Sequence, residues 1–399
     1  MAPVLDIDAL IDDPQTRVVV CCGAGGVGKT TVAAALGLRA AESGRQVVVL
    51  TIDPARRLAQ SLGLTTLDNT PRPVRSIDDT HGGSLDAMML DMKRTFDEVV
   101  MAHAAPDKAE QILANPFYQA VSSSFAGTQE YMAMEKLGQL RLEADRNPDN
   151  PRWDLIVVDT PPSRSALDFL DAPKRLGSFL DGRFIRILAA PAKVGGRAYL
   201  KVFTTGVNIV TTAMTKLLGG QMLTDVQTFV AALDTMFGGF RERADHTYAL
   251  LSDSATKFIV VAAPERDALR EAAYFVDRLD EEGMPLAGLV VNRVYRVSAP
   301  GLSAARALSA AEELDDIENG SSSNGRSNGS SGVSESTAIT QALLRLHAVQ
   351  AEIAGRHQAL AKRFIAGHPD IPTVEVPAAS QDIHDLVGLR AVGEALAGQ

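Results

Sequence analysis

Residues 18–35, VVVCCGAGGVGKTTVAAA, constrain the fold more than any other stretch of this 399-residue chain. An apolar run of strand length is followed by a glycine-rich turn and an alanine-rich segment typical of a helix. The turn matches G-x-x-x-x-G-K-[ST], the phosphate-binding loop (Walker A), in the strand–loop–helix context that this loop requires. An ordinary glycine-rich turn before a helix is the alternative, but the lysine and threonine favour a nucleotide site.

The loop predicts contacts to ATP and Mg²⁺. Glycines let backbone N–H groups face a phosphate, and the start of the helix adds the positive end of its dipole. We expect Lys29 to reach the β- and γ-phosphates, the Thr30 hydroxyl to hold Mg²⁺ and Thr31 to contact the α-phosphate. The predicted ATP-binding residues of this stretch are Gly23, Ala24, Gly25, Gly26, Val27, Gly28, Lys29, Thr30 and Thr31.

Polar side chains end three further strand-like runs. Asp53 follows residues 46–52, Asp159 follows residues 155–158, and Asn292 lies near the end of residues 286–293. Side chains at the carboxyl ends of parallel strands point into the crevice where ligands bind. Asp53 is predicted to orient or activate a water at the γ-phosphate, or to cap the next helix, and the two roles are compatible. Asp159 is predicted to accept hydrogen bonds from the hydration shell of Mg²⁺, and Asn292 lies where hydrogen bonds to adenine are expected.

Alternating strand-like and helix-like runs predict an α/β fold. We expect a doubly wound, mostly parallel sheet of the P-loop NTPase type with an inserted α-helical subdomain. The core is assigned to 15–91, 151–172, 256–300 and 368–399, and the helical subdomain to 92–150 and 173–255. Residues 309–338 are expected to form a disordered insert, and 339–366 a long helix that returns to the core. The apolar helical faces either bury one another or form a groove for an apolar client.

Composition argues against several classes of protein. The net charge is −10 and no basic stripe stands out, which argues against a nucleic-acid partner. No apolar run is long enough for an integral membrane segment, and the N-terminus lacks a signal-peptide core. The two cysteines, Cys21 and Cys22, are adjacent and suit a reducing, cytoplasmic location. We interpret them as core residues of the first strand, with a redox pair as the alternative.

Five motifs in order, GGVGKTT, TIDPA, VVDTPPS, APE and VVNR, resemble the ArsA-type ATPase family. That family is similar to the MinD and ParA ATPases of the deviant Walker A class. It includes the arsenite-efflux ATPase and the eukaryotic ATPase that targets tail-anchored membrane proteins. The likeness is strongest to actinobacterial ArsA-like proteins encoded as two different subunits. It covers most of the chain except 309–338 and is weakest at 173–250.

The resemblance implies an ATPase whose homo- or heterodimers close across the nucleotide. It assigns Asp53 to switch I as the water-activating carboxylate and Asp159 to switch II. It also implies nucleotide contacts by Glu265, Asn292 and Pro377. ATP is preferred over GTP on this resemblance and because the chain has no N-K-x-D guanine signature.

The chain departs from the family at the second position of the loop. Relatives usually read GKGGVGKT, and that first lysine reaches the partner's phosphates, but Ala24 stands here. Either another cation substitutes, with Arg56, Arg57 and Arg164 as candidates, or a different subunit supplies the lysine. The zinc-binding CxxC of the targeting ATPases and the arsenite-binding cysteines are also missing.

Three functions remain open from the sequence. The first is an ATP-driven targeting factor or chaperone for an apolar client or a membrane protein. The second is the energising subunit of an anion or metalloid exporter. The third is a weakly active regulatory subunit that pairs with a lysine-containing paralogue.

Overall fold

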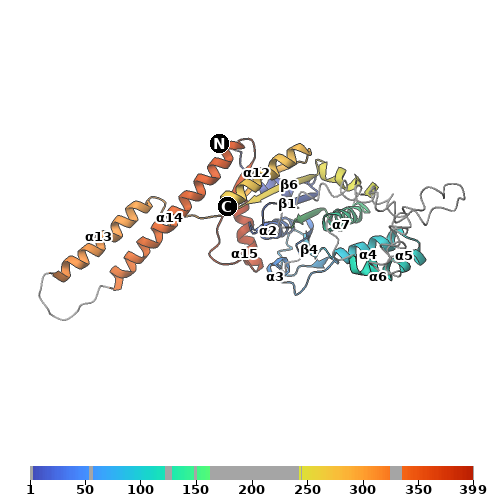
Figure 1. The fold of residues 1–399 in the computed structure, drawn as a ribbon, viewed down its shortest axis with the longest axis horizontal. Coiled ribbons are helices and arrows are strands. Elements are labelled where there is room, and N and C mark those ends of the chain that lie inside the picture. Colours follow the sequence, from blue (N-terminus) through green and yellow to red (C-terminus); the bar gives the residue numbers. More distant parts are fainter. Residues whose placement is uncertain are drawn as a thin grey trace, which may run out of the picture.

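The computed structural model describes residues 3–53, 57–121, 128–147, 151–161, 242–243, 245–323 and 335–398. Within them, eight strands form one sheet in the order β3-β4-β2-β5-β1-β6-β7-β8 (Figure 1). The strands are β1 Val18–Cys22, β2 Gln46–Thr51, β3 Arg72–Pro73, β4 Ser84–Met89, β5 Leu155–Asp159, β6 Thr256–Ala262, β7 Leu286–Val294 and β8 Thr373–Pro377. All neighbouring pairs are parallel except the antiparallel β3 and β4. The predicted mostly parallel α/β sheet is confirmed.

Helices cover both faces of this sheet, as its buried strands require. The described helices are α1 Ile7–Asp12, α2 Lys29–Glu42, α3 Arg57–Ser61, α4 Met92–His103, α5 Pro106–Leu113, α6 Pro116–Val121, α7 Thr128–Asp145, α12 Arg266–Glu281, α13 Ala304–Ser323, α14 Glu335–Gly367 and α15 Leu386–Leu396. Alternate residues of β1 enter two different hydrophobic clusters. Val20 packs with residues of α7 and α12, whereas Val19 packs with residues of α2 and α15. The sheet is therefore doubly wound around a two-sided core.

The adjacent cysteines are ordinary core residues of β1. Both thiols are free and buried, and they belong to opposite faces of the sheet. Burial raises the pKa of Cys21 well above its ordinary value and that of Cys22 to about 12. A thiol that stays protonated is a poor nucleophile, so this environment favours the structural interpretation over a redox pair.

Helices α4–α7 do not form a separate core, which differs from the expected subdomain at 92–150. Buried side chains from all four helices, such as Val99, Ile112, Tyr118 and Leu137, join the cluster on one face of the sheet. Their apolar faces are continuous with that cluster, so this part packs on the nucleotide-binding core. The rest of the expected subdomain lies largely outside the described residues, including the apolar face at 226–240.

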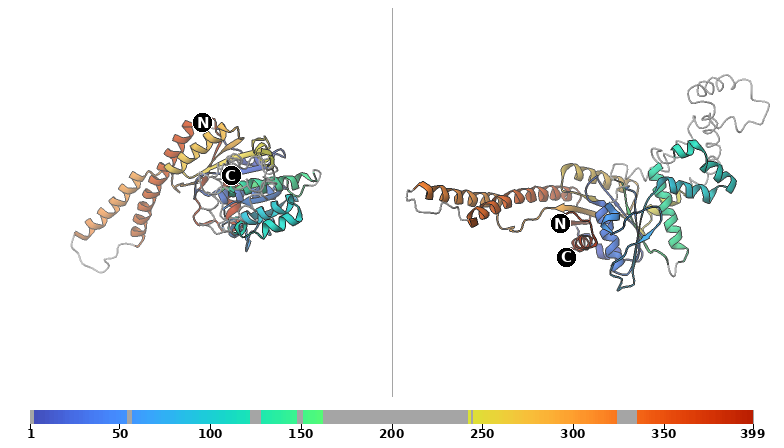
Figure 2. Two further views of the ribbon diagram at one scale, coloured as in Figure 1. Left: turned by 45° about the vertical axis from the view of Figure 1, so that its right-hand side comes forward. Right: turned by 90° about the horizontal axis from the view of Figure 1, so that it is seen from below.

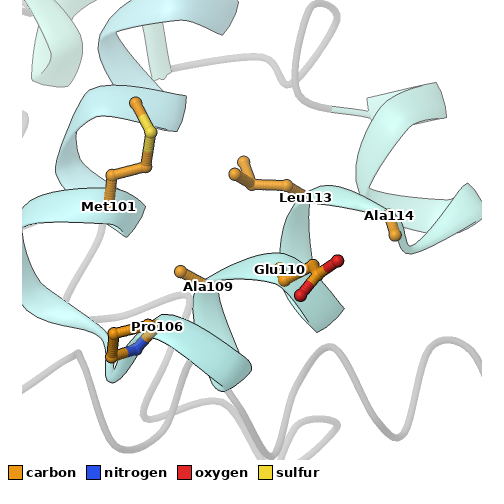
Figure 3. A pocket seen from close by; sticks show the side chains of 6 residues that line it. All are labelled: Met101, Pro106, Ala109, Glu110, Leu113 and Ala114. Atoms are coloured by element: carbon orange, nitrogen blue, oxygen red, sulfur yellow. The ribbon is translucent and has the colours of Figure 1, made fainter.

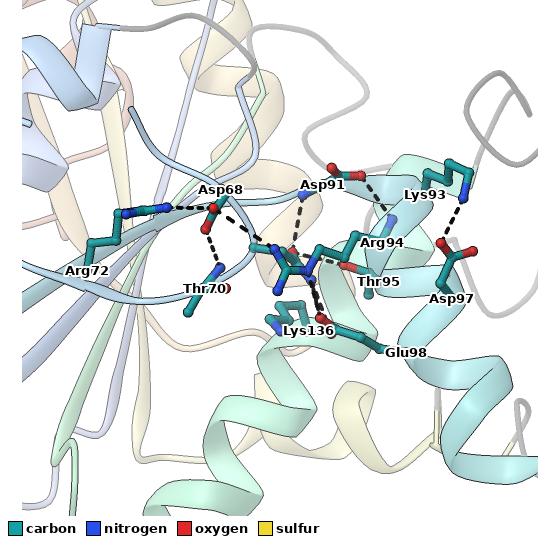
Figure 4. A network of polar contacts seen from close by, with 11 residues as sticks. Asp68, Thr70, Arg72, Asp91, Lys93, Arg94, Thr95, Asp97, Glu98 and Lys136 are labelled. Atoms are coloured by element: carbon teal, nitrogen blue, oxygen red, sulfur yellow. Dashed lines mark hydrogen bonds and ion pairs between the residues drawn. The ribbon is translucent and has the colours of Figure 1, made fainter. Parts of the chain in front are cut away.

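A polar network fixes α4 to its neighbours (Figure 4). Glu98 of α4 accepts hydrogen bonds from Asn69 at 3.1 Å and from Lys136 of α7 at 3.1 Å. The Asn69 side chain also accepts a hydrogen bond from the Thr95 hydroxyl at 3.1 Å. Asp68 binds Arg72 at 2.8 Å on the other side of the network. The network joins α4 and α7 to the segment between α3 and β4.

The expected disordered insert at 309–338 is wrong over much of its length. Helix α13 reaches Ser323 and α14 begins at Glu335, while residues 324–334 lie outside the described residues. The two helices form a hairpin that extends away from the sheet (Figure 2). Small buried residues, Ala307 of α13 and Ala348 of α14, allow close packing. Helix α14 spans the residues of the long helix that the sequence predicts at 339–366.

Candidate functional site

The glycine loop between β1 and α2 has a backbone that other residues would not adopt. Gly26 has φ +78° and Gly28 has φ +94°, in the left-handed region where side chains are disfavoured. A Cβ on Gly23 would lie 2.1 Å from the Val261 carbonyl oxygen of β6. Gly28 precedes α2 and no side chain caps that helix start. The loop is therefore suited to an anion that uses the N–H groups at the helix start.

Lys29 closes over this loop from the first turn of α2. Its ammonium Nζ donates a hydrogen bond to the Ala24 carbonyl oxygen at 2.8 Å, and the residue is 5% exposed. Burial lowers the pKa of Lys29, while the negative charges of Asp159 and Asp53 act in the opposite direction. The amine is thus held inside the loop, next to the place predicted for the phosphates.

Asp159 is the buried acid at the centre of the site. It ends β5, and its Oδ2 accepts hydrogen bonds from the hydroxyls of Thr30 at 2.7 Å and Thr51 at 2.9 Å. Its Oδ1 is buried and has no hydrogen-bond partner among the described residues. Burial raises the pKa of Asp159 to about 6, although the two hydroxyl hydrogen bonds and Lys29 lower it. An unpaired carboxylate oxygen beside two hydroxyl groups fits a cation or its water.

Asp53 lies at the adjacent strand end. The register pairs Thr51 of β2 with Asp159 of β5, so Asp53 follows two residues beyond that pair. Its N–H donates to the Thr51 hydroxyl at 3.2 Å, and its charge raises the pKa of both Lys29 and Asp159. Asp53 and Asp159 therefore lie at the carboxyl ends of the neighbouring strands β2 and β5, close enough to Lys29 for their charges to act on it.

The predicted adenine-side residues are placed differently. Asn292 is 7% exposed, and its Nδ2 donates to the Val27 carbonyl oxygen at 2.8 Å. Glu265 is exposed at the start of α12, without a side-chain cap. Pro377 ends β8 and pairs with Val294 of β7. All three lie at the carboxyl side of their strands, and Asn292 is the one that hydrogen-bonds the glycine loop among the described contacts of these three residues.

Sequence reasoning missed two residues at the site. Thr51 donates to Asp159, although an internal threonine in a strand carries no motif signal. Arg293 donates from Nη1 to the Gly26 carbonyl oxygen at 2.8 Å. Of the arginines proposed to replace the missing lysine, Arg57 is exposed in α3, and the other two lie outside the described residues.

Two further features bear on partners and ligands. No described helix is both long and apolar enough to cross a membrane. A cavity of about 470 Å³ opens at helices α4 and α5 (Figure 3), and its lining is Met101, Pro106, Ala109, Glu110, Leu113 and Ala114. Its wall is apolar except for Glu110, and Met101 is 58% exposed.

Known proteins resemble this chain over much of its length. The family described as anion-transporting ATPase (ArsA ATPase) matches residues 16–320. Protein Rv2184c of Mycobacterium tuberculosis is 30% identical over 186 residues, which are 42% of this chain and 40% of that protein. ATPase GET3C of Arabidopsis thaliana is 24% identical over 289 residues, 70% of this chain and 67% of that protein. Arsenical pump-driving ATPase of Escherichia coli is 25% identical over 279 residues, 69% of this chain and 39% of that protein.

The chain thus matches less than half the length of two of these three relatives. The family match covers more than half of the chain and includes the loop, Asp53, Asp159 and Asn292. The strand order and the doubly wound sheet agree with that match. The chain belongs to the ArsA-type family of anion-transporting ATPases.

Proposed function

We propose that this chain binds Mg-ATP at the glycine loop and hydrolyses it. The observation that carries the proposal is the meeting of Lys29, Thr30 and Asp159 at the start of α2. Lys29 is buried against the loop, and Thr30 is joined to Asp159 by a 2.7 Å hydrogen bond. An amine and oxygen ligands beside the glycine loop support a site for a triphosphate.

The residues divide the work of phosphoryl transfer to water. Lys29 would stabilise the negative charge that spreads over the γ-phosphate oxygens. Thr30 and Asp159 would hold Mg²⁺, directly or through its waters, and a bound Mg²⁺ neutralises phosphate charge. The described residues contain no group of three or more His, Cys, Asp or Glu suited to a metal, so water and phosphate would complete the shell. Asp53 would orient the attacking water.

The test is ATP turnover by the purified full chain. We expect Lys29→Ala and Asp53→Asn each to lower the rate about 100-fold or more, because each removes a group that acts on the transition state. Arg296→Ala, at an exposed position beyond β7, is the matched control and should keep the wild-type rate. Near-normal turnover in both site variants would contradict the assignment.

We further propose that ATP-driven closure of a homo- or heterodimer moves helices that handle an apolar client. The apolar cavity at α4 and α5 supports this targeting or chaperone function, because α4 belongs to the same packed unit as the sheet. Binding of an apolar peptide should differ between the ATP-bound and the nucleotide-free protein. Equal binding in both states would refute client handling while leaving ATP hydrolysis intact. The cytoplasmic location stays a prediction.

Two alternatives keep specific support. An exporter subunit is suggested by relatives named arsenical pump-driving ATPase, and stimulation of turnover by arsenite or antimonite would favour it. A regulatory subunit is suggested by Ala24, and activation only after mixing with a lysine-containing paralogue would favour that function.

A further inference from the structure

Two consecutive side chains of β7 hold two consecutive carbonyls of the glycine loop. Asn292 Nδ2 donates to the Val27 carbonyl at 2.8 Å, and Arg293 Nη1 donates to the Gly26 carbonyl at 2.8 Å. The Asn292 Oδ1 in turn accepts the N–H of Arg293 at 2.9 Å. The pair therefore forms one hydrogen-bonded unit on the outer side of the loop.

The backbone around this pair is unusual for a strand. The register between β7 and β8 shifts between Val291 and Val294, which places the pair in an irregularity of the ladder. Such bulges re-aim side chains. Arg293 has φ +60°, a conformation that arginine rarely adopts. Gly28 also leaves room for the pair, because a Cβ there would lie 2.3 Å from Asn292 Nδ2.

Because the peptide group is planar, fixing the direction of a carbonyl also fixes the direction of the next residue's N–H. The described chain has no cis peptide bonds, and in a trans peptide the C=O and N–H point in opposite directions. Holding the carbonyls of Gly26 and Val27 outward aims the N–H groups of Val27 and Gly28 to the other side. Neither of these N–H groups donates to a main-chain carbonyl among the described residues.

We propose that Asn292 and Arg293 are positioning residues that fix the Val27 and Gly28 amides for the phosphates. The proposal rests on the nucleotide site proposed above and extends it. It gives Asn292 a role besides the expected contact with adenine, because its Nδ2 bonds the loop and its Oδ1 bonds Arg293. Adenine recognition would require that amide to face the base, whereas the loop contact is independent of the base.

A ligand without a base separates these two roles. Tripolyphosphate and ATP binding are measured by calorimetry for the full chain and for Arg293→Gly and Asn292→Ala. We expect each variant to lose about tenfold in affinity for both ligands, the loss typical of one hydrogen bond. GTP should weaken by the same factor as ATP in Asn292→Ala. Arg296→Ala is the control and should bind like the wild type.

Thermal unfolding excludes a merely structural effect. Glycine adopts φ +60° without strain, so Arg293→Gly should unfold no earlier than the wild type even though it binds more weakly. Arg293→Lys keeps a donor and should recover part of the affinity. If Asn292→Ala does not fold, Arg293→Gly still carries the test.

The possible results distinguish failure of the positioning role from failure of the nucleotide site. Unchanged tripolyphosphate affinity in both variants would overturn the positioning role. Loss confined to ATP, with loss of preference over GTP, would return Asn292 to adenine recognition. A wild-type protein that binds neither tripolyphosphate nor ATP would overturn the nucleotide site itself.

Discussion

Replacing Asp159 by asparagine should change how stability depends on pH. Burial raises the pKa of Asp159 from 3.8 to about 6 in the folded protein. The folded state therefore holds a proton at pH values where the unfolded state has lost it, so the free energy of unfolding falls as pH rises from about 4 to 6. A shift of about two pKa units corresponds to about 3 kcal/mol in total. About 2 kcal/mol of this falls between pH 4.5 and pH 7.5.

The assay is urea unfolding of wild type and Asp159→Asn in EDTA without nucleotide. The chain has one tryptophan, Trp153, which is 1% exposed and lies just before β5, so its fluorescence reports loss of the core. We expect the stability difference between variant and wild type to move by about 2 kcal/mol in favour of the variant from pH 4.5 to pH 7.5. Titrating groups far from position 159 cancel in that comparison, and the asparagine's own hydrogen bonds add a difference that does not change with pH. If the stability difference between variant and wild type stays constant with pH, the raised pKa of Asp159 is refuted.

Three further outcomes follow from the described contacts. Arg45→Ala should cost about 2–4 kcal/mol in urea unfolding, because its guanidinium bonds one carboxylate and several carbonyls at the base of the sheet; a cost below about 1 kcal/mol would contradict this. Gly28→Ala should weaken ATP at least about tenfold in calorimetry, whereas Gly283→Ala, with φ +66° and open space, should leave ATP binding unchanged. Cys21 and Cys22 should resist a thiol reagent at pH 8 until the protein is unfolded, and rapid labelling of the folded protein would refute their burial.

The strands and the glycine loop could be predicted because each depends on residues that are adjacent in the sequence. The four central strands β1, β2, β5 and β6 are short, mostly apolar runs, and parallel strands buried on both faces have that composition. The glycine loop must turn sharply before α2, so its glycines are visible in the sequence. Asp53 and Asp159 follow from the same rule, since a carboxylate after a buried strand lies at the ligand edge of a parallel sheet.

Composition misled at the α13–α14 hairpin because long-range packing decides its structure. The stretch after residue 316 is rich in serine, glycine and asparagine, which disfavour a helix. Ahead of it, however, Ala307 and Ala311 pack closely against α14. Asp315 also accepts hydrogen bonds from Gln341 and Arg345 of the facing helix. Contacts between segments 26 to 30 residues apart leave no local signature.

The hydroxyl of Thr51 and the guanidinium of Arg293 show a similar limit at the site itself. Each bonds a partner that is distant in the sequence. Thr51 of β2 meets Asp159 because β2 lies beside β5, and Arg293 of β7 meets the loop after β1 although β6 lies between those strands. A motif search compares residue types along the chain, and it therefore finds Lys29 and Thr30 but not Thr51 or Arg293. The VVNR motif lies near the end of β7, as predicted. The sequence gives no sign of the φ of +60° at Arg293, which accompanies its contact with the loop.

The charges at the site explain why Lys29 and Asp159 are best considered together. Burial alone would neutralise both, because it lowers the pKa of an amine and raises that of a carboxyl. Each charge counters that effect on the other, and Asp53 favours the charged amine while disfavouring the charged carboxyl. An added phosphate would strengthen the preference of Lys29 for its charged form, whereas a cation beside Asp159 would favour the carboxylate. Anion and cation would therefore bind cooperatively, as a Mg-ATP site requires.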